Sequence, residues 1–275
     1  MKGGSLPPFF VRKDYTVNSN FILLATTFGE SVMNSFKKFA DEFYRIFIKD
    51  ARWTWITEGL LNTLIITVGA LVIGIVIGIL VAAVRSSFDK NREELKKRGG
   101  FKYSLLAVLN WVCKIYITVI RGIPVVVQLM IWYFIILISV DEGVPVAMVA
   151  FGVNSGAYVA EIFRSGIMSI DHGQFEAGRS LGFSYFQMMR YVVIPQAFKV
   201  VLPTLCNEFI ALIKETSIAG YVGIMDLTKA GDLIRGRTFK AFMPLIGVAV
   251  IYLLLVIILT WLVGKLERRL RKSER

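Results

Sequence analysis

Residues that bind metal ions or form disulfides are scarce in this sequence of 275 residues. Histidine occurs once and cysteine twice. A single histidine, His172, is too few for a multi-histidine metal site, so we interpret it as a loop residue. Cys113 and Cys206 lie in apolar stretches, without the spacing of metal ligands or of a disulfide framework. We therefore expect no metal site in this chain.

Charge is also missing from long stretches of the chain. The 25 residues from Leu60 to Val84 carry no charged side chain. A helix needs about 20 apolar residues to cross the hydrocarbon core of a bilayer, whereas a core helix of a soluble protein would show a polar stripe. Hydrophobic residues make up 55% of the chain, above the roughly 45–50% of soluble domains. The sequence therefore indicates an integral membrane protein.

The positive net charge of +12 fits the same class. Lysine and arginine flank the apolar runs, as they do in the cytoplasmic loops of membrane proteins. Residues 85–102 alone hold seven of them. We therefore expect these charges to lie near membrane lipid, and we expect no nucleic acid among the partners.

Five apolar runs predict an all-α membrane protein with about five transmembrane helices. They lie at about 60–84, 122–140, 144–163, 192–213 and 241–264. Residues 103–120 are apolar but carry Lys114, which predicts an interfacial segment leading into the second span. Residues 214–240 are predicted to form a polar loop. The basic tail after the last span places the C-terminus in the cytoplasm and, with five spans, the N-terminus outside.

Residues 1–58 differ in composition from the membrane domain predicted at 59–275, and we expect them to form an extracytoplasmic segment. Within this segment, apolar residues recur at helical spacing among charged ones: Phe28, Val32, Phe36, Phe39, Phe43 and Phe47. The pattern predicts an amphipathic helix lying on the membrane interface. A helix packed on other protein would show the same pattern, and the sequence does not separate the two.

The polar segment between the third and fourth spans predicts two short helices outside the bilayer. Two pairs of residues have capping-box spacing: Asp171 with Gln174, and Ser184 with Gln187. Gly182 lies between them and suits a helix end. Four apolar side chains are predicted to be exposed: Phe175, Leu181, Phe183 and Phe186. An ordered apolar projection of this kind is suited to docking into a groove on another protein.

This segment resembles the cytoplasmic EAA motif of the permease subunits of binding-protein-dependent ABC importers. The family pattern is E-A-A, three residues, G, nine residues, and then I-x-L-P. Glu176-Ala177-Gly178, Gly182 and Val192-Val193-Ile194-Pro195 keep this spacing, with a glycine for the third alanine and two aliphatic replacements. The resemblance covers roughly residues 55–275. It implies that five residues couple the chain to an ATPase: Glu176, Ala177, Gly178, Leu181 and Gly182.

Three other stretches are similar to the polar amino acid branch of that family. They are Arg121-Gly122-Ile123-Pro124 with Gln128, Asn154-Ser155-Gly156-Ala157-Tyr158 with Glu161, and Asn207-Glu208-Phe209-Ile210-Ala211-Leu212. Ile123 departs from the threonine that is common in that branch. The resemblance implies a permease in the plasma membrane of a prokaryote, moving a polar amino acid from an extracytoplasmic binding protein into the cytoplasm. It also implies ATPase subunits and a second permease subunit, identical or different.

The chain contains no phosphate-binding loop of the pattern Gly-x-x-x-x-Gly-Lys-[Ser/Thr]. We therefore expect no ATPase activity, no catalytic residue and no directly bound cofactor, with ATP used by a partner subunit. Such a chain would convert closure of the ATPase subunits into alternating access by rigid-body movement of its helices.

Polar residues inside the spans are candidates for the translocation pathway, because isolated polarity in hydrocarbon is costly. Asn154 lies near the middle of the third predicted span, and Asn207 and Glu208 lie near the middle of the fourth. Hydrogen bonds between helices explain these residues equally well. Arg121 and Glu161 fall towards the inner ends of their predicted spans, which predicts a structural pair or two interfacial anchors and not substrate ligands.

Three other interpretations remain open at this point. A permease for another small solute would share the docking segment. A secondary transporter would show internal repeats and broken helices at matching positions, and five spans do not divide evenly. A non-transport membrane protein would give no reason for the spacing of the EAA-like segment.

Overall fold

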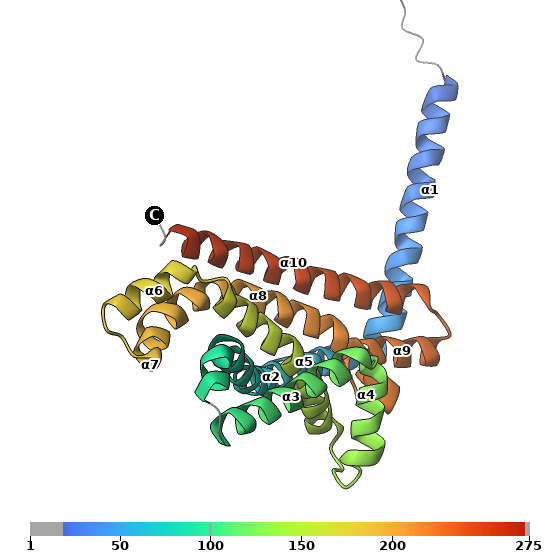
Figure 1. The fold of residues 1–275 in the computed structure, drawn as a ribbon. Coiled ribbons are helices and arrows are strands. Elements are labelled where there is room, and N and C mark those ends of the chain that lie inside the picture. The colour runs from blue at the N-terminus through green and yellow to red at the C-terminus, as the bar shows by residue number, and fades with distance from the viewer. Residues whose placement is uncertain (1–18, 99–100, 273–275) are drawn as a thin grey trace, which may run out of the picture. The chain divides into compact units, whose positions relative to one another are not determined.

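The computed structural model describes residues 19–98 and 101–272, and every regular element in these ranges is helical (Figure 1). The predicted all-α fold is therefore confirmed for this part of the chain. Contacts within the chain divide it into two compact units, residues 1–51 and 52–275.

The first unit contains one long helix, α1 (Ser19–Phe43), which continues into a π-helical turn, η1 (Tyr44–Ile48). Four members of the predicted apolar row are exposed: Val32, Phe36, Phe39 and Phe43. Phe47, the last member of the row, is buried, and the centroid of its ring lies 5.0 Å from that of Phe43. The side chain of Phe28 lies outside the described residues. The interfacial position of this helix stays a prediction.

The second unit is built from the helices that carry the apolar runs. In chain order they are α2 (Trp53–Arg98), α3 (Phe101–Gly122), α4 (Val125–Ile131) with η2 (Trp132–Ile136), α5 (Gly143–Met168), α6 (His172–Ser180), α7 (Tyr185–Met188) with η3 (Met189–Val193), α8 (Ile194–Glu215) with η4 (Thr216–Val222), α9 (Leu227–Thr238) and α10 (Phe242–Lys272). Five stretches are long and apolar enough to cross a membrane: Trp53–Asp89, Tyr103–Gly122, Gly143–Met168, Tyr185–Val222 and Phe242–Leu270. The predicted number of spans is confirmed for the described residues, while their bounds differ.

The second of these stretches is Tyr103–Gly122 and not the predicted 122–140. Pro124 has no backbone N–H and disfavours helical backbone at the residue before it, so the helix ends at Gly122 and α4 starts anew. The apolar residues after the break form a shorter helical segment, Val125–Ile136. Lys114 does not prevent a crossing by α3, because a lysine side chain is long enough to extend towards the headgroups.

Residues 214–240 are mostly helical, comprising the end of α8, then η4 and α9, which corrects the expectation of a polar loop. Within this segment, α9 packs against α2 and α10. Three apolar residues of α9 are buried: Leu227, Ala230 and Ile234. Their spacing of three and four residues places them on one helical face. The sequence contained this signal, but it is short and surrounded by charged residues.

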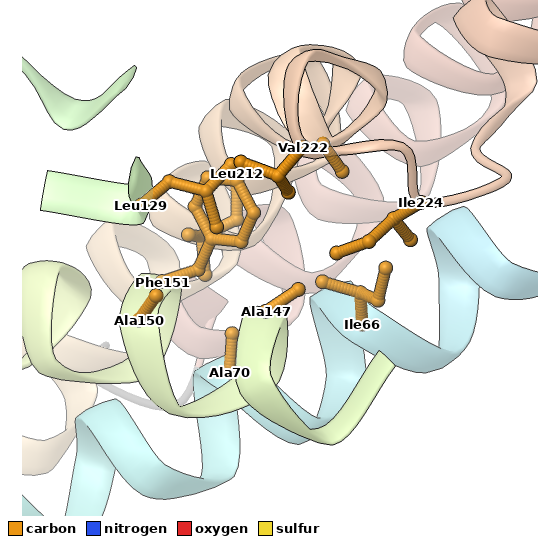
Figure 2. Close-up of a cluster of buried hydrophobic side chains, with 10 residues drawn as sticks. Ile66, Ala70, Leu129, Ala147, Ala150, Phe151, Leu212, Val222 and Ile224 are labelled. Atoms are coloured by element: carbon orange, nitrogen blue, oxygen red, sulfur yellow. The ribbon is translucent and has the colours of Figure 1, made fainter. Parts of the chain in front are cut away.

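One hydrophobic cluster joins the segment around η4 to four helices, and Figure 2 shows its side chains. Its members are Ile66, Ala70, Leu129, Ala147, Ala150, Phe151, Leu212, Ala219, Val222 and Ile224. Phe151 of α5 and Leu212 of α8 are completely buried. Leu129 brings the short α4 into the same cluster. The broken second apolar run therefore contributes to the core of the bundle and is not a peripheral loop.

The contact between α2 and α5 is the most extensive between any two helices of the unit. Glycines occur four residues apart on both sides of it: Gly74 and Gly78 on α2, and Gly152 and Gly156 on α5. A Cβ atom on Gly78 would lie 2.5 Å from Cγ1 of Val159, and one on Gly152 would lie 2.7 Å from Cβ of Ile73. Small residues at this spacing let helix backbones approach closely in a membrane. These four glycines therefore set the distance between α2 and α5.

Asp226 caps the N-terminus of α9 and is completely buried. Its Oδ1 accepts a hydrogen bond of 2.8 Å from the backbone N–H of Lys229. Beside it, Oγ1 of Thr63 accepts a bond of 3.1 Å from the N–H of Leu227, which ties α9 to α2. Oδ2 of Asp226 has no hydrogen-bond partner among the described residues. Burial raises the pKa of this carboxyl from 3.8 to about 6, although the Lys229 N–H opposes the shift.

Asp226→Asn is expected to stabilise the protein at neutral pH by up to about 3 kcal/mol, the equivalent of about two pKa units. The folded-state pKa of about 6 lies above the usual 3.8. The contribution of the protonated carboxyl to the free energy of unfolding is therefore fully present below pH 3.8. It is lost as the pH rises through 6. Asparagine retains the oxygen for the Lys229 N–H and carries no charge. The midpoint of thermal unfolding in detergent, measured across this pH range, checks the prediction.

The matched control is Asp232→Asn on the same helix, where the carboxylate is exposed and pairs with Arg235 at 2.6 Å. An exposed pair contributes about 1 kcal/mol or less, so this variant should change the midpoint little. If Asp226→Asn and the wild type keep parallel curves across the whole pH range, the buried carboxyl does not set the pH dependence.

Candidate functional site

The segment with the EAA-like spacing forms α6 and the turn that follows it. At its start, Oδ1 of Asp171 accepts a hydrogen bond of 2.6 Å from the N–H of Gly173. The capping box predicted with Gln174 is therefore wrong, because the Asp171 side chain caps the helix through Gly173. Glu176 is the fifth residue of α6 and is exposed.

The end of α6 is a tight turn at Gly182. The N–H of Phe183 donates to the carbonyl of Gly178 at 3.0 Å, and the N–H of Gly182 donates to the carbonyl of Arg179 at 2.9 Å. This pair of bonds is a Schellman motif, which requires a left-handed residue after the helix. The φ angle of Gly182 is +80°. The predicted helix end is confirmed, and a Cβ atom at Gly182 would have no described residue within 4 Å other than its chain neighbours.

The second predicted capping box is confirmed at the start of α7. The N–H of Gln187 donates to Oγ of Ser184 at 3.3 Å, and the N–H of Ser184 donates to Oε1 of Gln187 at 2.8 Å. Both α6 and α7 are therefore capped by their own residues, and α7 continues through η3 into α8. The segment is ordered by local bonds at each of its turns.

A small core holds α6 against α7. Phe175, Met188 and Val193 are buried together. Phe175 was predicted to be exposed, but it is only 9% exposed because it points into this core. Gly178 is buried beneath Met188, where a Cβ atom would lie 1.7 Å from the Cε atom. Gly178 therefore faces the neighbouring helix and not a partner protein.

The outer side of α6 and α7 carries an apolar surface, which we call the docking surface. It consists of Leu181, Phe183, Tyr185, Phe186 and Tyr191. Leu181 is 76% exposed and Phe186 is 69% exposed. Ala177 and Glu176 are also exposed on α6. Leu181 and Phe183 precede the fourth apolar stretch, and Tyr185, Phe186 and Tyr191 lie in its first turns. Large apolar side chains exposed on an ordered turn are typical of a protein interface.

Among the pathway candidates, Asn154 lies inside the helix bundle. Its Oδ1 accepts a hydrogen bond of 3.3 Å from Nε2 of Gln128. The same Nε2 donates to the carbonyls of Ile120 and Ile123, both at 2.7 Å, next to the break at Pro124. Asn154 is buried. These contacts support the structural interpretation of Asn154, and its role in a pathway stays a prediction.

The other two candidates lie on α8. Oε1 of Glu208 accepts a bond of 2.9 Å from Oγ of Ser155, which joins α8 to α5. Asn207 is exposed, as are Thr204 and Lys214, which follow the same helix face at spacings of three and seven residues. We call these three residues the polar stripe. A polar stripe on a membrane-spanning helix indicates a surface that does not face lipid.

Four charged residues form an ion-pair network between α2 and α5. Nη1 of Arg85 lies 2.5 Å from Oε1 of Glu161, and Nη1 of Arg164 lies 3.1 Å from Oδ2 of Asp89. Nε of Arg164 lies 3.6 Å from the second oxygen of Glu161. α5 ends at Met168, shortly before α6 begins. The network therefore ties the end of α5 that leads into α6 to the neighbouring helix α2.

The predicted pair of Arg121 with Glu161 is wrong. The Arg121 guanidinium lies over the Tyr158 ring, 5.1 Å from its centroid. Because α3 itself is the second span, Arg121 lies in its last turn and not at the start of a span. Sequence reasoning missed Arg85, although its position directly after the uncharged run was a usable signal.

The family of binding-protein-dependent transport system inner membrane components matches residues 100–272 of this chain. The glutamine transport system permease protein of Escherichia coli is 37% identical over 218 residues, which cover 78% of this chain and 92% of that protein. The arginine transport system permease protein of Bacillus subtilis is 36% identical over 224 residues, which cover 80% of this chain and 94% of that protein.

Two solved structures share the fold. A chain in the crystal structure of an amino acid ABC transporter with histidines is 36% identical, with a TM-score of 0.69, and the match covers 81% of this chain and 98% of that one. A chain of the MetNI methionine ABC transporter in an inward-facing conformation has a TM-score of 0.67, with 81% and 98% covered. Its identity of 21% supports the fold alone. The chain belongs to the family of binding-protein-dependent transport system inner membrane components, which are the membrane-spanning permease subunits of ABC importers.

Proposed function

We propose that this chain is the permease subunit of an importer for polar amino acids, moving them from an extracytoplasmic binding protein into the cytoplasm. ATP is hydrolysed by partner ATPase subunits. The observation that carries the proposal is the docking surface on α6 and α7. The names of the glutamine and arginine permease relatives support the class of substrate.

The docking surface suits the transfer of force from an ATPase because it is apolar, exposed and rigid. Leu181 and Phe186 present large side chains, and buried aromatic or aliphatic anchors dominate the energy of most protein interfaces. The Schellman turn and the capping box keep the two helices from fraying. A push on this surface therefore moves α6 and α7 as a body.

Two connections carry such a movement into the membrane helices. The core of Phe175, Met188 and Val193 leads through η3 into α8 without a loop. The network of Arg85, Glu161 and Arg164 joins the neighbouring end of α5 to α2. Rigid-body movement of packed helices is the usual way in which such bundles alternate between two states.

The substrate pathway in this proposal runs along α8. Glu208 supplies a carboxylate inside a span, where an unused charge would be costly. The polar stripe of Thr204, Asn207 and Lys214 continues the polar surface along the helix. A second permease subunit would close this surface from the other side and exclude lipid from it.

The orientation follows from the same assignment. Docking to a cytoplasmic ATPase places α6 and α7 inside the cell, so the N-terminal segment lies outside and the C-terminal tail inside. The basic residues at the end of α10 agree with this orientation, since cytoplasmic flanks carry an excess of lysine and arginine.

Reconstitution with ATPase subunits and a binding protein that co-purify with this chain tests the proposal and gives the next prediction. We expect ATP-driven uptake of a polar amino acid, and we expect Glu208→Gln to lower it by tenfold or more. Glutamine keeps the volume and the oxygen that accepts from Ser155 but removes the charge. A hydrogen bond to a charged group contributes about 1.5–3 kcal/mol, which is on the order of tenfold to a hundredfold in rate.

The control is Glu142→Gln in the exposed turn before α5, which should transport at the wild-type rate. Unchanged uptake of every transported amino acid by Glu208→Gln would leave Glu208 with only its bond to Ser155. Specific uptake without any binding protein, or of a solute that is not an amino acid, would contradict the proposed function itself.

A further inference from the structure

An apolar groove runs between α2, α8 and α10. Its volume is about 400 Å³. The lining residues are Leu71, Ile75, Leu202, Leu205, Cys206, Phe209, Ile210, Leu259, Leu262, Val263 and Leu266. Leu262 is exposed at its rim, while Leu205 is buried in its floor. The docking surface and the polar stripe lie on other residues, so neither of them accounts for this groove.

The length of the groove matches one leaflet of a bilayer. It follows α8 from Leu202 to Ile210 and α10 from Leu259 to Leu266. At 1.5 Å per residue these stretches are roughly 12 and 11 Å long. One leaflet contributes about half of the roughly 30 Å hydrocarbon core. The groove therefore has the length and the polarity of a site for an acyl chain.

Two cations continue the groove beyond its apolar end. Lys199 precedes Leu202 by three residues, and Arg269 follows Leu266 by three. Residues three or four apart lie on the same face of a helix, so the two cations lie on the faces that line the groove. Neither makes an ion pair with any described residue.

The surrounding charge is also positive. Lys265 and Arg268 are exposed on the same turns of α10. Glu267 is the one acidic residue there, and it follows the lining residue Val263 by four, so it lies on the groove face too. Together with Lys199 and Arg269, four cations stand against one carboxylate, a net charge of +3. The ammonium of Lys265 lies 5.3 Å from the centroid of the Trp261 ring. Tryptophan beside lysine is typical of the level where headgroups meet hydrocarbon.

This charge argues against a second copy of the chain in the groove. A two-fold axis along the membrane normal brings the same residues of both copies to the same depth. The cations at the mouth would then face cations. An anionic headgroup would instead be attracted, because each basic residue near an anionic surface contributes about 1 kcal/mol.

We propose that this groove binds one acyl chain of an anionic phospholipid, with the headgroup phosphate held by Lys199 and Arg269. The lipid belongs to the leaflet that faces the cytoplasm, and this assignment of leaflet rests on the proposed function. Bound there, the lipid fills the space between α10 and the helices α2 and α8. The positive charge at the mouth should select the anionic headgroup, and the apolar lining should hold the acyl chain. These two requirements for lipid binding are tested separately.

The test measures lipid binding by native mass spectrometry of the full chain purified in detergent. Phosphatidylglycerol is compared with zwitterionic phosphatidylcholine of the same acyl chains. We expect one phosphatidylglycerol per chain, bound roughly 25-fold more tightly than phosphatidylcholine. Two cations at about 1 kcal/mol each, with a factor of ten for each 1.4 kcal/mol or so, lead to this ratio.

Two variants separate the contribution of the lipid headgroup to binding from that of the acyl chain. The double variant Lys199→Gln with Arg269→Gln should lose most of the preference for phosphatidylglycerol and keep its fold, because both side chains reach solvent. Cys206→Trp fills the groove and should weaken the binding of both lipids by tenfold or more. The matched controls are Arg235→Gln with Arg237→Gln on α9, and Leu253→Trp on an exposed face of α10. Neither control should change lipid binding.

Equal affinity of the wild type for the two lipids would overturn the proposal, as would a double variant that retains the preference. If Cys206→Trp leaves lipid binding unchanged but shifts the mass of the assembly, the groove is an interface between copies and the proposal is wrong. These readouts do not depend on transport, so they can fail while the proposed function stands.

Discussion

Gly182→Arg is expected to leave the membrane helices inserted and folded while lowering ATP-driven uptake by tenfold or more. Gly182 lies at the tip of the turn between α6 and α7, beside the exposed Leu181. Apart from its two chain neighbours, no described residue lies within 4 Å of the position of its Cβ. The arginine side chain would therefore project outward. In the proposed complex it would enter the ATPase's groove, where an unpaired charge is costly to desolvate.

Two costs add in this variant. A side chain at φ +80° strains the backbone by about 1–2 kcal/mol, which weakens the Schellman turn. Loss of an anchoring contact in an interface costs about 2 kcal/mol or more, on the order of thirtyfold in affinity for the ATPase. The measurements are co-purification of the ATPase and substrate-stimulated hydrolysis in reconstituted membranes.

Gly182→Ala separates the two costs, because it brings the backbone strain without the bulk or the charge. We expect it to lie between the wild type and Gly182→Arg in uptake. Gly236→Arg on α9 is the matched control, since a Cβ there also meets nothing within 4 Å. Normal assembly and wild-type uptake by Gly182→Arg would show that this segment is not the coupling element.

Gly78→Val is expected to destabilise the membrane domain by about 3 kcal/mol or more and to abolish uptake through loss of folded protein. The new Cβ would lie 2.5 Å from Cγ1 of Val159 and 2.9 Å from the backbone nitrogen of Ala160. Backbone cannot move aside as the end of a long side chain can, so α2 and α5 would have to separate. Overpacking of this kind costs about 1–3 kcal/mol for smaller insertions.

Separation of α2 from α5 would also break the ion pair between Arg85 and Glu161. Both side chains are partly buried, and a charge that loses its partner in such a place destabilises the fold. Size-exclusion chromatography after heating in detergent measures the loss as a lower midpoint. Gly264→Val on α10 controls for the β-branched residue itself, because its Cβ has open space. Equal midpoints for the two variants would mean that the glycines of α2 do not set the helix spacing.

The two glycines act at opposite ends of one mechanical path. In the proposed mechanism, Gly182 shapes the turn that contacts the ATPase, and Gly78 lets α2 lie close enough to α5 to move with it. Between them lie the core of Phe175 and Met188 and the network around Glu161. A variant in the turn should therefore uncouple a stable protein, whereas a variant in the glycine contact should remove the protein itself.

The sequence by itself determined the class of protein and the local form of the docking segment. The uncharged run from Leu60 to Val84 requires a membrane, because a helix of a soluble protein would show a polar stripe towards water and this run carries no charged residue. The capping box of Ser184 and the helix end at Gly182 depend on residues within a few positions. Such signals are complete in a short stretch of chain, so they were read correctly.

Local rules failed where a residue had alternatives nearby. Asp171 could cap its helix through Gly173 or in a box with Gln174, and only the folded backbone chose between them. The second span was misplaced because Pro124 divides one apolar run, and only the part before it, Tyr103–Gly122, is long enough to cross the membrane. The position of Arg121 was wrong for the same reason.

Only the tertiary structure decided which helices meet. Glu161 pairs with Arg85, which lies 76 positions away, because glycines on both helices let α2 and α5 run in close contact. Asn154 turned inward to Gln128, while Asn207 faces outward from α8. Hydropathy is nearly equal on all sides of a membrane helix, so it does not reveal which face packs against protein. That choice depends on the shape and hydrogen bonding of several helices at once.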